Sequence, residues 1–432
     1  MTTGTMVNAY VPGSGNLSPE DQARIARRTR LLGPAYRLFY ETPVHFVRGE
    51  GVWLYDAAGA AYLDCYNNVA SLGHCHPHVV AATARQSALY ASHTRYLHDT
   101  VLDYAERLLA TLPDALSQVM FTCTGSEAND LALRVAFAHT GGTGVIVTEN
   151  AYHGVTLATS SLSPSLGTGV ALGPHIRTVP APDPGHMSGD PGAAFAAGVQ
   201  RAVDDLTRHG IQPAALLVDT IFSSDGVFAE PKGFLAPAAA TIRAAGGLFI
   251  ADEVQPGFGR TGDAMWGFQR HGLVPDMVSM GKPMGNGYPV AGLALQPHVI
   301  AAFGAKARYF NTFGGNAVAA ATAMAVLDVI EAEGLQANAA SVGAYFRDGL
   351  QSLTHPNLGP LRAAGLFLGH DIVTEGEPDA KKAAHIVNRL RENRILISAT
   401  GPRGHVLKIR PPLIFTKTHV DHFLNGLTQA LT

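Results

Sequence analysis

The fold of this chain is decided by the stretch Phe249-Ile250-Ala251-Asp252-Glu253-Val254-Gln255, in which two acids follow directly on an apolar run. The apolar run is typical of a buried strand, and ligands in open α/β sheets collect beyond the carboxyl ends of such strands. An acid that caps the next turn is the structural alternative, but it does not explain both Asp252 and Glu253. We therefore expect an α/β sheet with a polar site at this strand end.

Strand candidates of the same kind alternate with helical patterns between residues 75 and 305. The strand candidates cover residues 119–122, 145–148, 215–222, 248–251, 277–279 and 290–294. The helical patterns between them cover residues 128–138, 193–209 and 235–245. Short buried strands that alternate with helices predict a mostly parallel sheet with helices on both faces.

The two ends of the chain have a different pattern and predict a smaller α+β domain. The N-terminal elements that we expect are a loose arm at 1–16, a helix at 21–32 and a hairpin at 47–63. The C-terminal elements are helices at 317–334, 336–353 and 380–394, strands at 395–398 and 405–409, and a last helix from Thr418. The predicted division is 1–74 for the arm and part of the small domain, 75–315 for the large domain, and 316–432 for the rest of the small domain.

The composition excludes several classes of function. With 432 residues, of which 47% are apolar and 15% charged, the chain can form two domains and a sizeable subunit interface. A formal net charge of −3 predicts no basic surface for nucleic acid or for an anionic membrane. The three cysteines give no paired framework, and residues 1–15 lack the pattern of a signal peptide. We expect a cytoplasmic protein in which the apolar stretch 317–330, interrupted by Asp328, is a buried helix.

Lys282 follows another strand candidate and lies between glycines, in the stretch Gly281-Lys282-Pro283-Met284-Gly285. Glycines let a backbone approach a ligand closely. A lysine in such a wall loses its proton readily, and the free amine can form a Schiff base with an aldehyde. For this residue alone, a solvated loop lysine is an equal alternative. The neighbouring strand ends favour the ligand-binding interpretation.

Two more strand ends carry groups that suit a phosphate and a planar ring. Gly125 and Ser126 open a helix directly after a strand, where Gly125 permits an unusual turn and free N–H groups can bind an anion. Tyr152 ends the next strand and can stack on a heterocycle. A well-capped turn and a half-buried tyrosine are the respective alternatives. A phosphate cradle, a ring, an acid and an amine nevertheless appear in chain order, each at a strand end.

These motifs resemble those of the class III (fold type I) pyridoxal-phosphate enzymes, the group of ornithine, 4-aminobutyrate and alanine–glyoxylate aminotransferases. The resemblance runs from about residue 35 to the C-terminus. It is most specific in the stretch 252–262, Asp-Glu-Val-Gln-Pro-Gly-Phe-Gly-Arg-Thr-Gly, and in the Gly-Lys-Pro pattern at Lys282. It implies an α/β fold type I transferase that uses pyridoxal 5′-phosphate.

The resemblance also implies a role for each matching residue. Lys282 is the Schiff-base lysine and proton shuttle, and Asp252 keeps the pyridine nitrogen protonated. Tyr152 stacks on the cofactor ring, and Gln255 donates to or accepts from its hydroxyl group.

The cofactor phosphate has partners from two subunits under the same resemblance. Gly125 and Ser126 bind it within one subunit, and Thr312, in the run Asn311-Thr312-Phe313-Gly314-Gly315, reaches it from the other. The resemblance therefore implies a homodimer with shared active sites, and it leaves open whether dimers pair into tetramers.

The reaction is less clearly defined than the family. Four stretches are most similar to the ethanolamine-phosphate and phosphohydroxylysine phospho-lyases, and they are residues 62–70, 94–99, 126–134 and 406–413. Under this hypothesis Arg410, with Arg37 and Arg95 as further candidates, meets the leaving phosphate, because a planar guanidinium can grip phosphate at two points. The alternative is an alanine–glyoxylate or ω-amine:pyruvate aminotransferase, in which Arg410 holds a substrate carboxylate. For Arg37 and Arg95, a salt bridge is the structural alternative.

Two other interpretations are weaker. The run His74-Cys75-His76-Pro77-His78 contains metal-ligand residue types, but neighbouring side chains of an extended chain point to opposite faces and no second ligand pair follows. We expect no metal there. A binding protein that has lost catalysis would lack the lysine or the acid, and this chain has both.

Overall fold

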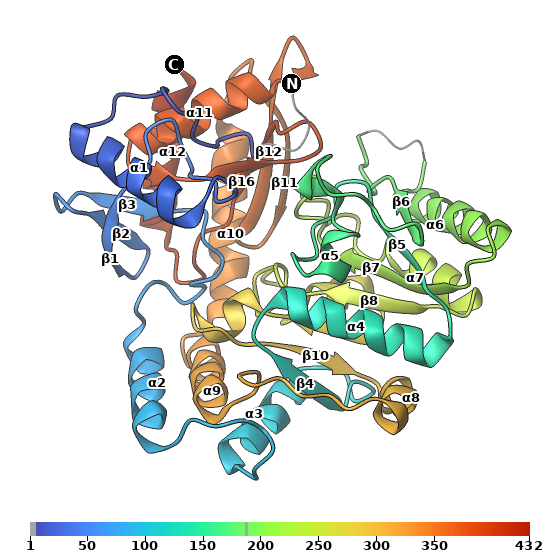
Figure 1. The fold of residues 1–432 in the computed structure, drawn as a ribbon. Coiled ribbons are helices and arrows are strands. Elements are labelled where there is room, and N and C mark those ends of the chain that lie inside the picture. The colour runs from blue at the N-terminus through green and yellow to red at the C-terminus, as the bar shows by residue number, and fades with distance from the viewer. Residues whose placement is uncertain (1–5, 186–188) are drawn as a thin grey trace.

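A computed structural model describes residues 6–185 and 189–432, so residues 1–5 of the expected arm lie outside it. A seven-stranded sheet with strand order β4-β10-β9-β8-β7-β5-β6 forms its centre (Figure 1). β10 is antiparallel to both neighbours, and the other pairs of this sheet are parallel. The strands are β4 (Gln118–Thr122), β5 (Gly144–Thr148), β6 (Ile176–Val179), β7 (Pro213–Asp219), β8 (Leu248–Asp252), β9 (Met277–Met280) and β10 (Ala291–Leu295). The predicted mostly parallel sheet is confirmed.

Apolar layers cover both faces of this sheet. Because successive side chains of a strand point to opposite faces, Leu248 and Ile250 of β8 pack with one helix layer. Phe249 and Ala251 pack with the other. The first layer is α4 (Gly125–Thr140) with α8 (Pro297–Lys306), and the second is α6 (Pro191–Arg208) with α7 (Ala236–Ala244).

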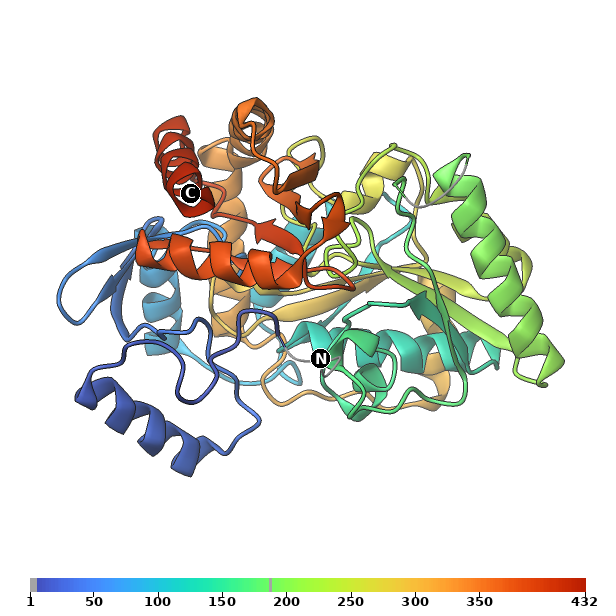
Figure 2. The same cartoon turned by 90° about the horizontal axis from the view of Figure 1, so that it is seen from above.

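Two smaller sheets lie beside the central one and join distant parts of the chain (Figure 2). The first sheet is formed by β1 (Phe46–Glu50), β2 (Trp53–Asp56), β3 (Ala61–Asp64) and β14 (Ile395–Leu396). In it, Leu63 pairs with Ile395, which ties the N-terminal strands to the C-terminal part. The second sheet is formed by β11 (Leu358–Ala364), β12 (Phe367–Thr374), β13 (Glu377–Pro378), β15 (Ser398–Thr400) and β16 (Val406–Ile409).

The remaining helices surround these sheets. α9 contacts α2 and α3, and many of its residues are buried, as predicted for residues 317–330. These helices are α1 (Pro19–Leu32), α2 (Pro77–Leu89), α3 (Asp99–Leu109), α5 (Leu157–Ser160), α9 (Ala317–Ala332), α10 (Leu335–Ser352), α11 (Ala380–Glu392) and α12 (Lys417–Leu431). Across residues 6–185 and 189–432, no helix is long and apolar enough to cross a membrane.

Several sequence expectations about the elements differ from the structure. The end of the N-terminal arm is packed and not loose, since Asn8 is buried and its Oδ1 accepts a hydrogen bond from Ser398 Oγ at 2.9 Å. β7 ends at Asp219 and not at residue 222, because the Asp219 carboxylate accepts the amides of Ile221 and Ser223 and turns the chain. β6 and the β11–β12 hairpin were not expected. β11 is largely half-buried and contains Pro360, which hides the usual strand pattern.

Candidate active site

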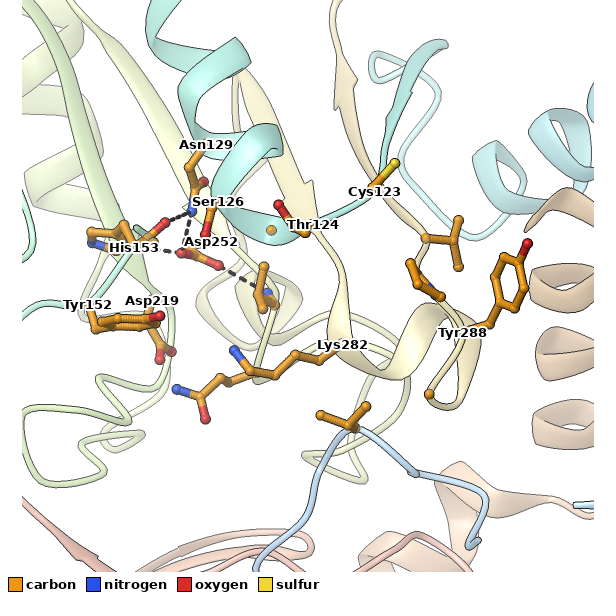
Figure 3. Close-up of a pocket in the computed structure, with 18 residues that line it drawn as sticks. Cys123, Thr124, Ser126, Asn129, Tyr152, His153, Asp219, Asp252, Lys282 and Tyr288 are labelled. Carbon is orange, nitrogen blue, oxygen red and sulfur yellow. Dashed lines mark hydrogen bonds and ion pairs between the residues drawn. The ribbon is translucent and has the colours of Figure 1, made fainter. Parts of the chain in front are cut away.

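A cavity of about 320 Å³ lies at the carboxyl ends of the central strands (Figure 3). The loops that follow β4, β5, β8 and β9, together with Asp219 at the end of β7, contribute side chains or backbone to its wall. The strand ends therefore bring together Ser126, Tyr152, Asp219, Asp252 and Lys282. Four of these were predicted from the sequence as parts of one site.

The N-terminus of α4 forms an anion cradle in this wall. Thr124 caps the helix by accepting the amide of Glu127 at 3.1 Å, and Glu127 Oε2 accepts the amides of Cys123 and Thr124. The amides of Gly125 and Ser126 have no hydrogen-bond partner within the described part of the chain. Together with the positive end of the helix dipole, they form a site for a phosphate group.

Two glycines allow the loops to close around this cradle. Gly125 has no positive φ and belongs to α4, so the unusual turn expected there is wrong. A glycine is required instead by Val254, whose Cγ2 would lie 2.8 Å from an added Cβ. Gly154 has a φ of +137°, and its added Cβ would lie 2.6 Å from Ser126 Oγ. Ser126 Oγ accepts the amide of Val155 at 3.1 Å, which leaves its own proton free for a ligand.

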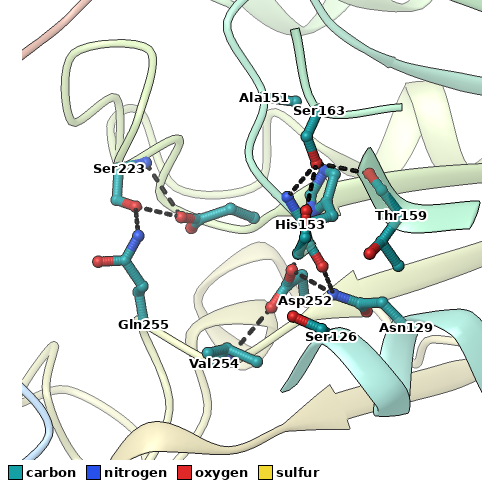
Figure 4. A network of polar contacts seen from close by, with 12 residues as sticks. Ser126, Asn129, Ala151, His153, Thr159, Ser163, Ser223, Asp252, Val254 and Gln255 are labelled. Atoms are coloured by element: carbon teal, nitrogen blue, oxygen red, sulfur yellow. Dashed lines mark hydrogen bonds and ion pairs between the residues drawn. The ribbon is translucent and has the colours of Figure 1, made fainter. Parts of the chain in front are cut away.

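Asp252 is buried at the end of β8 and is held by three donors (Figure 4). Its Oδ2 lies 2.9 Å from Asn129 Nδ2 and 2.7 Å from His153 Nδ1, while its Oδ1 accepts the amide of Val254 at 3.1 Å. These donors fix the orientation of the carboxylate. The sequence interpretation missed Asn129 and His153. The available signal was weak: Asn129 is a buried polar residue one helical turn after Gly125, and His153 adjoins Tyr152.

Removing the His153 side chain tests its part in positioning Asp252. His153→Ala is expected to lower kcat about 10- to 100-fold, because a hydrogen bond to a charged group contributes roughly 1.5–3 kcal/mol. The pH dependence of the bound cofactor's visible absorption should shift as well, which loss of packing alone would not cause. His209→Ala, at an exposed histidine that does not line the cavity, is the control. An unchanged spectrum and kcat in His153→Ala would exclude this role.

Lys282 extends toward the space between Asp252 and Tyr152 (Figure 3). It begins a short 3-10 turn, Lys282–Gly285, directly after β9. Burial, and then the nearby charge of Arg410, lower its pKa to about 8. A pKa this low leaves a usable fraction of free amine near neutral pH. Burial, and then the charge of Asp252, raise the pKa of the half-exposed Tyr152, so its hydroxyl stays protonated.

Figure 4 shows Gln255 in contact with Ser223, and a further hydrogen bond on its other side joins Gln255 to Arg410 in the C-terminal part of the protein. Gln255 Nε2 donates to Ser223 Oγ, and Ser223 Oγ donates to Asp219. On the other side, Gln255 Oε1 accepts from Arg410 Nη1. Because a guanidinium only donates, Arg410 forces the carbonyl oxygen of Gln255 to face it. The amide nitrogen of Gln255 therefore faces Ser223, in the loop that follows β7.

The other residues predicted for the site do not line the cavity of this chain. Arg410 is buried and does not line the cavity, although it contacts Gln255, which does. Arg37 and Arg95 are exposed and do not line it either. The guanidinium carbon of Arg95 lies 3.7 Å from the centre of the Phe310 ring. Thr312 is also exposed, outside the cavity of its own chain.

The histidine tract does not converge on one point. His74 Nε2 lies 2.8 Å from Asp64, His76 Nε2 lies 3.2 Å from Glu333, and His78 Nε2 lies 3.3 Å from Asp328. These contacts lead to separate acids. Residues 6–185 and 189–432 contain no group of three or more His, Cys, Asp or Glu that could hold a metal ion.

Comparison with known proteins gives the family that the fold and the cavity indicate. The model of the class III aminotransferases matches residues 39–431, and the chain belongs to this family of pyridoxal-phosphate-dependent enzymes. A solved phospholyase from Arthrobacter in complex with phosphoethanolamine is 41% identical, with a TM-score of 0.91 over 94% of this chain and 99% of that one.

Two relatives from animals are named after different reactions. An alanine–glyoxylate aminotransferase 2-like protein of Drosophila melanogaster is 39% identical and covers 94% of this chain and 86% of its own length. An ethanolamine-phosphate phospho-lyase homolog 1 of Caenorhabditis elegans is 36% identical and covers 94% of this chain and 93% of its own. Sequence similarity therefore extends to both reaction types.

The cavity fits pyridoxal phosphate on three counts. The unpartnered amides of Gly125 and Ser126 suit its phosphate, and the buried carboxylate of Asp252 suits its protonated ring nitrogen. The Lys282 amine, with its lowered pKa, suits its aldehyde. The protein is an enzyme that uses pyridoxal 5′-phosphate.

Proposed function

We propose that this enzyme is a phospho-lyase that eliminates phosphate from a phosphorylated primary amine such as O-phosphoethanolamine. The products are acetaldehyde, ammonia and phosphate, with one water consumed. The observation that carries this proposal is the 41% identity, over 94% of the chain, to a phospholyase whose structure contains phosphoethanolamine. The four stretches that are similar to phospho-lyases, at residues 62–70, 94–99, 126–134 and 406–413, agree with it, although such stretches also occur in alanine–glyoxylate-type aminotransferases.

The protein's own residues supply binding and proton transfer. When bound, the cofactor withdraws electrons from the amine and makes the hydrogen on the amine-bearing carbon acidic. Lys282 Nζ takes that proton, because burial and Arg410 lower its pKa to about 8, which leaves a fraction of free amine near neutral pH. Asp252 holds a proton on the ring nitrogen through the anchoring by Asn129 and His153. The C–O bond then breaks, and its electron pair leaves with the phosphate.

An aminotransferase is the alternative function, and one observation favours it. The Drosophila relative, at 39% identity, is named as alanine–glyoxylate aminotransferase 2-like. In that reaction, the same lysine would move the proton to the cofactor, and a keto acid would later take up the amine. Only the lyase needs a site for a departing phosphate.

The proposal includes a homodimer in the cytoplasm. The exposed Thr312 adjoins Phe313, which is 70% exposed, and Leu97 is 95% exposed. Large exposed side chains are common at subunit interfaces. In such a dimer Thr312 of one subunit would reach the phosphate cradle of the other. The low cysteine content fits a reducing compartment.

Product release without a keto acid separates the two reactions. Holo-enzyme incubated with O-phosphoethanolamine alone is expected to release phosphate and acetaldehyde in equal amounts over many turnovers. Both products are assayed in the same sample, and Lys282→Ala serves as the inactive control. If no phosphate appears, and an amine is transferred only after pyruvate or glyoxylate is added, the enzyme is an aminotransferase.

A further inference from the structure

Asp225 is a buried acid that lies outside the cavity, in the segment that follows β7. It is 6% exposed. Its Oδ2 accepts a hydrogen bond from Thr148 Oγ1 at 2.9 Å, and its Oδ1 accepts the amide of Asn150 at 3.2 Å. Thr148 is the last residue of β5, and Asn150 lies two residues before Tyr152, which lines the cavity. Asp225 therefore ties the turn that leads to Tyr152 to the segment after β7.

A second contact fastens the same turn. Asn150 Nδ2 donates to Ser224 O at 2.5 Å. This carbonyl oxygen also accepts from Thr400 Oγ1 at 3.1 Å and from the amide of Gly401 at 3.2 Å. Thr400 is the last residue of β15, and Gly401 follows it. The turn before Tyr152 is therefore linked, through one carbonyl group, to the sheet of the C-terminal part.

The segment that receives these contacts has a strained backbone. Phe222 has a φ of +53° and Val227 a φ of +67°, and both residues are buried. A left-handed conformation is costly for a large or β-branched residue, and it persists only where the surrounding structure determines it. Arg362 of β11 contributes to this, because its Nε donates to Gly226 O at 2.7 Å. Residues 222–227 therefore have one defined shape, against which the turn is held.

Tyr152 depends on its backbone for its position, whereas the neighbouring His153 has anchors of its own. The amide of His153 donates to Ser163 Oγ at 2.9 Å, and its carbonyl oxygen accepts from Asn129 Nδ2 at 2.9 Å (Figure 4). Its Nδ1 lies 2.7 Å from Asp252. Within the described residues the Tyr152 side chain has no hydrogen bond, and it is 37% exposed. Its ring can keep one position only if the turn that carries it is fixed.

We infer that Asp225, together with the Asn150 side chain, positions Tyr152 for stacking on the cofactor ring. Both are positioning residues, because neither lines the cavity and both act through the turn that carries Tyr152. An aromatic ring gains from stacking only in a defined arrangement with its partner ring, so a displaced Tyr152 would hold the cofactor less tightly. The inference goes beyond the proposed function, since a lyase and an aminotransferase of this family use the same cofactor.

The affinity for pyridoxal phosphate tests this assignment without a measurement of turnover. Asp225→Ala is expected to raise the dissociation constant of the cofactor about 3- to 10-fold, as for weakening of a stacked aromatic contact. Asp276→Ala, at an acid that is 7% exposed and does not line the cavity, is the matched control and should leave this constant unchanged.

The conservative variant Asp225→Asn separates the contacts of this side chain from its charge. Its Oδ1 can still accept the Asn150 amide, and its Nδ2 can donate to Thr148 Oγ1. The dissociation constant of the cofactor should therefore stay within about 2-fold of wild type. If Asp225→Asn binds the cofactor as weakly as Asp225→Ala, the charge and not the contacts is responsible, and the inference is wrong.

A double-mutant cycle shows whether Asp225 acts through Tyr152. In a Tyr152→Ala background no ring is left to position, so Asp225→Ala should change the dissociation constant less than about 2-fold. A general loss of structure would instead weaken binding by the same factor in both backgrounds. Equal factors would overturn the inference, and so would a dissociation constant of Asp225→Ala within 2-fold of wild type.

The remaining outcomes are also decisive. A shifted pH dependence of the bound cofactor's visible absorption in Asp225→Ala would mean that the substitution acts through His153 and Asp252, which contradicts the inference. Should Asp225→Ala not fold, Asn150→Ala, which removes the contact with Ser224 O, takes its place in the same cycle with the same expected results. The function test is separate, because phosphate release from O-phosphoethanolamine is measured on wild-type enzyme.

Discussion

Lys282→Ala is expected to abolish turnover, with kcat at least about 10³-fold below wild type. The amine is the only base that we place at the amine-bearing carbon, and removal of a positioned proton-transfer group typically lowers a rate by 10²–10⁴. Loss of the covalent anchor adds to this effect. Burial, and then Arg410, lower the Lys282 pKa to about 8, so the residue is suited to both tasks. The measurement is phosphate release from O-phosphoethanolamine by purified, cofactor-loaded protein.

A retained fold and retained cofactor make this result specific. Lys282→Ala should still bind pyridoxal phosphate through the Gly125–Ser126 cradle and Asp252, although gel filtration should remove it faster than from wild type. Lys381→Ala, at an exposed lysine of α11, is the matched control and should keep full activity. If turnover in Lys282→Ala stays within 10-fold of wild type, another residue moves the proton and the assignment of Lys282 fails.

The sequence predicts the central sheet and the main site residues because that information is local. Each predicted group stands directly after an apolar strand, as Lys282 follows β9 and Asp252 ends β8. In a parallel sheet the carboxyl ends of the strands meet at one edge. Knowing the strands therefore suffices to bring Ser126, Tyr152, Asp252 and Lys282 into one cavity.

Contacts between distant segments could not be predicted in this way. His153 is 99 residues from Asp252, and Asn129 is 123 residues from it, yet both hold its carboxylate. Arg410 is 155 residues from Gln255, and only the structure shows that its guanidinium donates hydrogen bonds to Gln255 and Tyr66. No strand pattern shows which donors a side chain has already used.

Asp252→Asn is expected to lower kcat by about 10²- to 10³-fold, as for the removal of one preorganised electrostatic group in an active site. The neutral amide cannot hold a proton on the ring nitrogen, so the cofactor loses its capacity to accept electrons. The asparagine also presents an N–H to Asn129 or His153, which both donate to Asp252 in the wild type. The bound cofactor's visible absorption should change, while far-UV circular dichroism should stay the same.

Asp276→Asn is the matched control for this prediction. Asp276 is also buried and directly precedes β9 of the same sheet, where it accepts from Arg243 Nε at 3.0 Å and from the amide of Phe249 at 2.8 Å, but it does not line the cavity. Its substitution should lower the free energy of unfolding by about 1–3 kcal/mol, the usual effect of weakening a buried hydrogen bond, with kcat within about 3-fold of wild type. Comparison of Asp276→Asn with Asp252→Asn therefore separates the effect of losing a buried charge from the effect of losing the acid that keeps the cofactor ring protonated. Near-normal kcat in Asp252→Asn, with the cofactor bound, would mean that another acid protonates the ring.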